Sequence, residues 1–306
     1  MKKGLILICI ILLQHTAIGQ GNQRYTQLEE ALKEPEKVKW LDLACMDVAR
    51  IDGQIDKLPN LESLYMTGCG LEELPNGIEK VAHLGLLNLQ DNNLNSLPLG
   101  LKKLVEITVI NLRGNDFKDL PEVLTDLPNL REIDLSNNKQ LNLGNALNSL
   151  SKVQKLDFLY LNGLNVSTMP LEMKGLKMLE ELHLSDNPNL ELPGAFNVLS
   201  QVPALKILAL SGNDLRFIPN ELKLMDQLDG LVLDNNPNID VSSLIENIDQ
   251  LPNLKVVLLR KNRLSQLPES LSGLAKLAVL ELSGNSFSES EKLRIRSSLP
   301  NTNVVF

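Results

Sequence analysis

The stretch LGLLNLQDNNL at residues 84–94 and the stretch ITVINLRGNDF at residues 107–117 share the pattern LxxLxLxxNxL. The pattern begins again at nine further positions: Val38, Leu61, Leu130, Leu156, Leu179, Leu205, Leu228, Leu254 and Leu277. Successive copies are separated by 23 or 26 residues. A fixed period of this length indicates one structural unit repeated along the chain, because each unit can bury its apolar side only against its neighbours.

Within each copy, the alternation of apolar and other residues predicts one short strand. The apolar residues at positions one, four and six face inward, while position five and its neighbours face outward. Asparagine fills the ninth position in eight copies: Asn92, Asn115, Asn138, Asn187, Asn213, Asn236, Asn262 and Asn285. An amide side chain both donates and accepts, so we expect it to satisfy backbone groups where the chain leaves the strand.

The second half of each copy returns the chain to the start of the next strand. A Leu-Pro step followed three residues later by an apolar residue, as in Pro98 with Leu101, predicts a short turn or 3₁₀ segment. The 26-residue copies have longer apolar backs, such as AFNVLSQV from Ala195 and SLIENIDQL from Ser243. We expect true helical turns in those copies, alternating with tighter ones.

The two ends of such an array need caps. Thr26 and Glu29 have the spacing of a capping box and predict a short helix within an N-terminal cap at residues 20–37. Ser288 and Glu291 repeat the spacing in a C-terminal cap at residues 288–306, where residues 303–306 could add a last strand. Between the caps, residues 38–287 form one elongated domain of eleven repeats in this interpretation.

Residues 1–19 have a different composition from the rest of the chain. Lys2 and Lys3 precede the apolar run LILICIILL, and Ala17-Ile18-Gly19 closes the segment with small residues. This order of charge, apolar run and small residues is typical of a cleaved export signal, and the run is short for a membrane-spanning helix. We expect a chain that begins near Gln20 and lies in a periplasm, on a cell surface or outside the cell. An uncleaved anchor is the alternative.

Charge and motifs argue against several functions. The formal charge is −8, and loss of two lysines with the signal makes it −10, which disfavours nucleic-acid binding. No phosphate-binding glycine loop and no His/Cys pair at metal-ligand spacing is present, so we expect no metal and no cofactor. Glu181, His183 and Ser185 on one strand suggest a hydrolase, but Ser185 belongs to a repeated serine column. We therefore expect no catalytic residues.

Two cysteines remain after removal of the signal. Cys69 takes the ninth position of its copy, and Cys45 lies one residue earlier in the preceding copy. Adjacent strands are about 4.8 Å apart, so a disulfide is within reach and would suit an oxidising compartment. A small buried side chain in the turn is the other interpretation of Cys69.

The repeats resemble those of leucine-rich repeat proteins over roughly nine-tenths of the mature chain. The LPxxI/L step is similar to that of Ras-group and scaffold-type members, whereas the export signal resembles secreted bacterial ones. The resemblance implies an α/β solenoid, a right-handed superhelix with a parallel sheet on its concave face and 3₁₀ or short helical segments on its convex face. It further implies that the concave face binds a macromolecule, usually a protein.

The outward strand positions are therefore the candidate binding residues. They comprise aromatics, a mixed and acid-rich middle, and an apolar C-terminal part: Trp40, Tyr65, Arg131, Glu132, Asp134, Asp157, Phe158, Tyr160, Glu180, Glu181, His183, Ile207, Ala209, Val232, Val256, Leu258 and Val279. Aromatics bury large areas at interfaces, and an apolar patch of a few hundred Å² often marks an interaction site. The leading hypothesis is a protein- or peptide-binding module without enzymatic activity. A glycan-binding surface protein and a self-associating homodimer are the alternatives.

Overall fold

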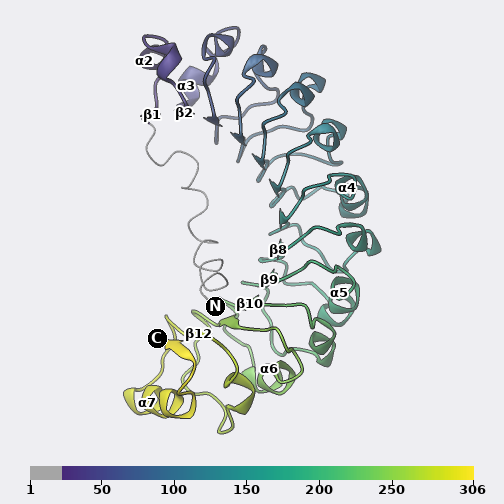
Figure 1. The fold of residues 1–306 in the computed structure, drawn as a ribbon, viewed down its shortest axis with the longest axis vertical. Coiled ribbons are helices and arrows are strands. Elements are labelled where there is room, and N and C mark those ends of the chain that lie inside the picture. Colours follow the sequence, from purple (N-terminus) through teal and green to yellow (C-terminus); the bar gives the residue numbers. More distant parts are fainter. Residues whose placement is uncertain (1–22) are drawn as a thin grey trace. The chain divides into compact units, whose positions relative to one another are not determined.

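The computed structural model describes residues 23–306, so the predicted export signal at residues 1–19 lies outside the described residues. The chain forms two compact units, one ending at Tyr160 and one running from Leu161 to Phe306. In each unit, every copy of the repeat makes one turn of the chain, called a coil from here on. Figure 1 shows the strand on one side of each coil and a helical segment on the opposite side.

In the first unit, each strand pairs in parallel with the next one along the chain. Its strands are β1 (Arg24–Tyr25), β2 (Trp40–Asp42), β3 (Ser63–Tyr65), β4 (Leu86–Asn88), β5 (Val109–Asn111), β6 (Glu132–Asp134) and β7 (Phe158–Tyr160). The repeat pattern predicts β2 to β7. It does not predict β1, which precedes the first copy and pairs Arg24 with Trp40.

The second unit continues the same pattern, again with parallel neighbours in sequence order. Its strands are β8 (Glu181–His183), β9 (Ile207–Ala209), β10 (Gly230–Val232), β11 (Val256–Leu258), β12 (Val279–Glu281) and β13 (Asn303–Val305). β13 is the predicted last strand. The fold class, an α/β leucine-rich repeat solenoid, is confirmed in both units.

The helical segments follow the length of the coil. In the first unit they are α2 (Leu28–Ala31), η2 (Pro35–Lys37), α3 (Cys45–Val48), η3 (Ile55–Lys57), η4 (Ile78–Lys80), η5 (Leu99–Lys103), η6 (Glu122–Asp126) and α4 (Leu143–Leu150), where η marks a 3₁₀ helix. In the second unit they are η7 (Leu171–Gly175), α5 (Leu192–Leu199), η8 (Asn220–Leu224), α6 (Val241–Ile248), η9 (Ser272–Leu274) and α7 (Glu289–Ser298).

The three 26-residue coils contain α4, α5 and α6, as the longer apolar backs predict. In the shorter coils, the segment that leads from one strand to the next has fewer residues. It therefore forms a tighter 3₁₀ turn or a single α turn. Across residues 23–306, no helix has both the length and the apolar character needed to cross a membrane.

The ninth-position asparagines join each coil to its neighbours. Asn236 is fully buried, and its side-chain amide donates to the carbonyls of Leu210 and Leu233 at 3.1 and 3.0 Å. Its Oδ1 accepts the backbone N–H groups of Asn213 and Leu215 at 3.0 and 3.1 Å. Buried backbone groups at this turn would otherwise be unsatisfied. The asparagine thus performs the role that its position predicts.

The two ends differ in how their helices are capped. The predicted capping box of Thr26 and Glu29 is wrong, because α2 begins after Gln27 and has no cap from its own segment. Its first N–H group, at Leu28, instead donates to Oδ2 of buried Asp47 at 3.0 Å. At the other end, Ser288 Oγ accepts from the Glu291 N–H group at 3.2 Å, as predicted.

The Glu291 side chain does not close the C-terminal capping box. It accepts the N–H group of Leu267 at 2.9 Å and pairs with Arg294 at 2.7 Å. The Arg294 guanidinium holds the pKa of Glu291 below its ordinary value. This carboxylate therefore ties the C-terminal helix to the preceding coil.

Candidate functional site

The candidate site is the outward surface of the strands, called the strand face from here on. In each three-residue strand from β2 to β12, the middle residue is buried in the core, as Leu41, Leu159 and Leu231 illustrate. The first and third residues point away from the core, because successive side chains of a strand alternate in direction. Parallel pairing then aligns the first residues of neighbouring strands in one column and the third residues in another.

An aromatic cluster lies at the N-terminal end of the strand face. The rings of Trp40 and Tyr65 are half-buried, with their centroids 6.0 Å apart and a 42° angle between their planes. The Arg24 guanidinium lies over the Trp40 ring, 5.6 Å from its centroid, and pairs with Asp42. Burial raises the pKa of Tyr65, and the Asp42 charge adds to the increase. The Arg24 side chain thus already lies over the Trp40 ring.

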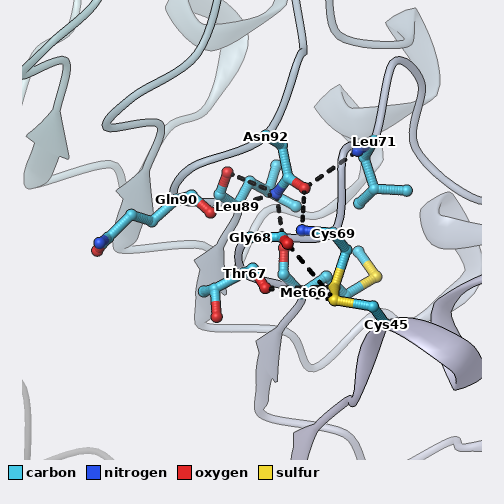
Figure 2. Close-up of a disulfide and its surroundings, with 9 residues drawn as sticks. All are labelled: Cys45, Met66, Thr67, Gly68, Cys69, Leu71, Leu89, Gln90 and Asn92. Atoms are coloured by element: carbon cyan, nitrogen blue, oxygen red, sulfur yellow. Dashed lines mark hydrogen bonds between the residues drawn. A yellow bond between two sulfur atoms is a disulfide. The ribbon is translucent and has the colours of Figure 1, made fainter.

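A disulfide links the two coils that carry this aromatic cluster. Cys45 at the start of α3 is bonded to Cys69 in the turn after β3, with their Cα atoms 4.9 Å apart (Figure 2). Cys69 takes the place that asparagine has in most coils, and its N–H group donates to Asn92 Oδ1 at 3.0 Å. The bond therefore connects β2 and β3 just beyond Trp40 and Tyr65, where one asparagine contact is missing.

The predicted central residues are divided between the two units. In the first unit, Arg131 forms an ion pair with Asp157, with Nε 2.9 Å from the carboxylate. Oδ1 of Asp134 accepts the N–H group of Ser136 at 2.8 Å. Glu132, Phe158 and Tyr160 are half-buried on the same strand face.

In the second unit, Glu180 pairs with Lys206 at 2.8 Å, outside the core. Glu181 is only 1% exposed, and its Oε1 lies 2.6 Å from Nε2 of His183. The other oxygen of Glu181, Oε2, is buried without a hydrogen-bond partner among the described residues. The sequence placed Glu181 and His183 correctly on one face but gave no sign that the carboxylate would be buried.

The hydrolase arrangement has a structural explanation in the turns after the strands. Ser185 Oγ accepts the N–H group of Ser211 at 3.1 Å, while Asn162 Oδ1 accepts the N–H group of Ser185 at 2.8 Å. The Ser185 oxygen is therefore used to hold the next coil. Among residues 23–306, no three His, Cys, Asp or Glu side chains are grouped as metal ligands.

Asn88 and Asn111 have a structural role that the sequence analysis missed. Each is the buried third residue of its strand, and its Oδ1 accepts the N–H group two residues later, at 3.1 and 2.9 Å. Asp134 makes the same contact. The signal was present as repeated Asx residues in one column, since such side chains commonly bond to the backbone two residues on.

The C-terminal part of the strand face is apolar over four consecutive strands, except at Glu281. The first residues of β9 to β12 are Ile207, Gly230, Val256 and Val279, and the third residues are Ala209, Val232, Leu258 and Glu281. Most of them are more buried than outward positions suggested, with Leu258 only 8% exposed. Side chains on adjacent strands cover one another because the strands are about 4.8 Å apart. Val232 and Val279 remain half-buried.

Charged side chains lie at both edges of these apolar columns. Burial raises the pKa of Asp229, just before β10, although the charges of Lys206 and Lys255 oppose the increase. Just after the strands, buried Asp234 pairs with Arg260 at 2.6 Å and accepts the Arg260 N–H group at 2.7 Å. The apolar surface therefore has a charged border, an arrangement typical of protein interfaces.

No protein-family model and no curated protein matches the chain. Solved structures do match it. A leucine-rich repeat protein of Leptospira interrogans has 22% identity, with 93% of this chain and 100% of that chain covered and a TM-score of 0.38. An internalin of Listeria monocytogenes has 19% identity, with 82% of this chain and 75% of that chain covered and a TM-score of 0.48. At these values the similarity says nothing about ligands or partners.

Proposed function

We propose that this chain is an exported protein without enzymatic activity that binds a protein or peptide ligand on its strand face. The apolar columns of β9 to β12 are the observation that carries the proposal. Six apolar side chains lie there in register on four strands, at positions where the fold accepts polar residues elsewhere. An apolar centre with a charged border suits a protein surface, because contact removes from water the apolar area that Val232 and Val279 still expose.

The aromatic side chains favour a protein ligand over a glycan. A sugar ring stacks on an open aromatic face, but Arg24 lies over one ring of the Trp40–Tyr65 pair. The two rings are also tilted by 42° and do not form a flat platform. Phe158 and Tyr160 are half-buried outward residues of a single strand. Such side chains can anchor an interface with little loss of rotamer freedom.

Introducing charge into the apolar columns should abolish ligand capture. Val232→Asp places a carboxylate at the half-buried centre of the columns, where its desolvation on binding is costly. We expect capture of the partner from native envelope and medium to fall about tenfold or more, with only a small change in thermal stability. Tyr160→Ala tests the first unit by the same measurement. Leu258 and Glu181 are poorer probes because both are buried.

Leu224→Asp is the matched control, since Leu224 is an exposed apolar residue of η8 away from the strands. It should leave capture unchanged. Normal capture by both Val232→Asp and Tyr160→Ala would remove the strand face from consideration. Conversion of a dimer to a monomer by Val232→Asp, seen by light scattering, would show that the face binds a second copy of the chain.

Export is tested at the N-terminus of the native protein. We expect sequencing of the protein from its source to begin near Gln20, because Ala17-Ile18-Gly19 presents small residues to a signal peptidase. A native protein that still contains residues before Ala17 would contradict cleavage at this position. The measurement is independent of any ligand.

A further inference from the structure

One coil has an aromatic residue, Phe217, at a position that is polar in the equivalent coils. Six coils contain the sequence L/F/V-x-x-L/M/I-P after the ninth position, and the residue two before the proline is exposed in all of them. Those six residues are Glu73, Ser96, Asp119, Thr168, Phe217 and Gln266. Five are polar, so the fold itself places no demand for an apolar side chain there. Phe217 is 62% exposed and is the one aromatic side chain among the six.

Phe217 lies at a hollow in the second unit. The hollow has a volume of about 460 Å³ and lies between α5 and the loop that leads to η8. Leu190, Leu192, Pro193 and Leu215 line it together with Phe217. This volume can accommodate one or two side chains of an extended peptide. The loop is attached to the next coil, because Asp240 donates its N–H group to the Arg216 carbonyl at 2.8 Å.

The first unit provides a natural comparison. A hollow of about 760 Å³ lies at the corresponding loops, and Ser96 and Asp119 take the places equivalent to Phe217. Lys118 and Glu122 also line it. The hollow is thus a feature of stacked coils, whereas the exposed aromatic ring is particular to the second unit.

The charge beside Phe217 indicates what the hollow can accept. Arg216 is exposed and forms no ion pair within the described part of the chain, although two other coils have serine at its position, Ser167 and Ser265. Asp214 is engaged, since its Oδ1 accepts from the Asn238 amide at 3.0 Å. Glu191 also lines the hollow and repels a second carboxylate on its own side, so a carboxylate from outside is favoured only beside the Arg216 guanidinium.

We propose that this hollow is a docking site for a peptide segment of a partner protein. The segment inserts an apolar side chain beside Phe217 and places an adjacent carboxylate against Arg216. The site is separate from the strand face and does not depend on the strand-face ligand proposed above. An aromatic anchor in a preformed hollow, next to a guanidinium that forms no ion pair with any of residues 23–306, is a common arrangement for an interaction hot spot.

The experiment uses a library of random peptides displayed on phage, selected on the purified full chain. Enriched peptides are synthesised, and their affinities are measured by fluorescence anisotropy for the wild type and three variants. Phe217→Thr and Arg216→Ser each introduce a residue that another coil has at the same position. Leu171→Asn is the control, because Leu171 is an exposed apolar residue outside the hollow and Asn220 takes its place in the coil of Phe217.

We expect selected peptides to contain an apolar residue next to Asp or Glu. Phe217→Thr should weaken their binding by about tenfold or more, Arg216→Ser should weaken it less, and Leu171→Asn should leave it unchanged. All three variants should unfold at the wild-type midpoint. The proposal is overturned if no such sequence is enriched or if Phe217→Thr retains wild-type affinity. It is also overturned if Phe217→Thr converts a dimer to a monomer, since the occupant would then be a second copy.

Discussion

Replacement of Asn236 by alanine should lower the free energy of unfolding by about 3–5 kcal/mol. The amide donates to three backbone carbonyls and accepts from two backbone N–H groups, which belong to its own coil and to the preceding one. Alanine removes the side-chain partner of the Asn213 and Leu215 N–H groups and of the Leu210 carbonyl, and each buried group left unsatisfied costs about 1–3 kcal/mol before the turn relaxes. The Leu233 carbonyl keeps a partner, because the Asn262 amide also donates to it. Asn213 makes fewer contacts, one accepted from Asn187 and one donated to Leu184. Asn213→Ala should therefore cost less, ~1–3 kcal/mol.

The sharper test is whether Asn236→Ala lowers the free energy of unfolding more than Asn213→Ala does. Urea unfolding followed by far-ultraviolet circular dichroism gives both values, with equal slopes indicating the same cooperative unit. Asn238→Ala is the control, because Asn238 is an exposed asparagine of the same turn that contacts one side chain, Asp214. It should cost about 0.5 kcal/mol or less. Equal costs for Asn236→Ala and Asn238→Ala would show that the buried amide does not hold the coils together.

The repeat made most of the fold predictable. A period of 23 or 26 residues fixes where each strand begins, and one repeated amide position fixes how neighbouring coils bond. The strands β2 to β12 and the longer helices of the 26-residue coils follow from those two patterns. This pattern is repeated in many copies, so a single exception, such as Leu164 at the ninth position of its copy, does not obscure it.

The N-terminal cap shows where this reasoning fails. Thr26 and Glu29 have capping-box spacing, yet α2 takes its cap from Asp47, nineteen residues further on. The pattern describes what one segment can do alone, whereas the adjacent coil supplies a better-placed carboxylate. β1 was missed for the same reason, since its two residues are defined by their pairing with β2. Ends of the array have one neighbour each and no repeated positions to compare.

The sequence predicted the direction in which the candidate side chains point, but not how deeply they are buried. Alternation correctly placed Trp40, Glu181 and Leu258 on the outward side of their strands. Their accessibility to solvent depends on neighbouring side chains, which the pattern does not describe. Arg24 lies over the Trp40 ring, and Glu181 is almost fully buried. Phe217 lies off the strands, so a search restricted to outward strand positions could not find it. Comparing equivalent positions among coils would have revealed it from the sequence.

Removal of the disulfide should destabilise the N-terminal coils by about 3 kcal/mol. The bond closes a loop with a sequence separation of 24 residues, which restricts the unfolded chain. It also joins coils in which Met46 and Cys69 take the ninth position in place of asparagine, so fewer amide contacts remain there. Trp40, the one tryptophan of the sequence, lies on β2 beside this bond. Its fluorescence therefore reports on the coils that the disulfide connects.

The test compares the wild type with Cys45→Ala/Cys69→Ala and Cys45→Ala/Cys69→Asn during urea unfolding. The double alanine variant should shift the Trp40 fluorescence transition to a lower urea concentration. This transition should precede the one seen by circular dichroism, because the distant coils retain their own contacts. The second pair should recover part of the loss. Asparagine at position 69 can donate to the carbonyls of Leu43 and Met66, as Asn92 donates to those of Met66 and Leu89 one coil later. An unchanged fluorescence midpoint in the alanine pair would mean that packing alone holds these coils, and the disulfide would then have no part in positioning Trp40 and Tyr65.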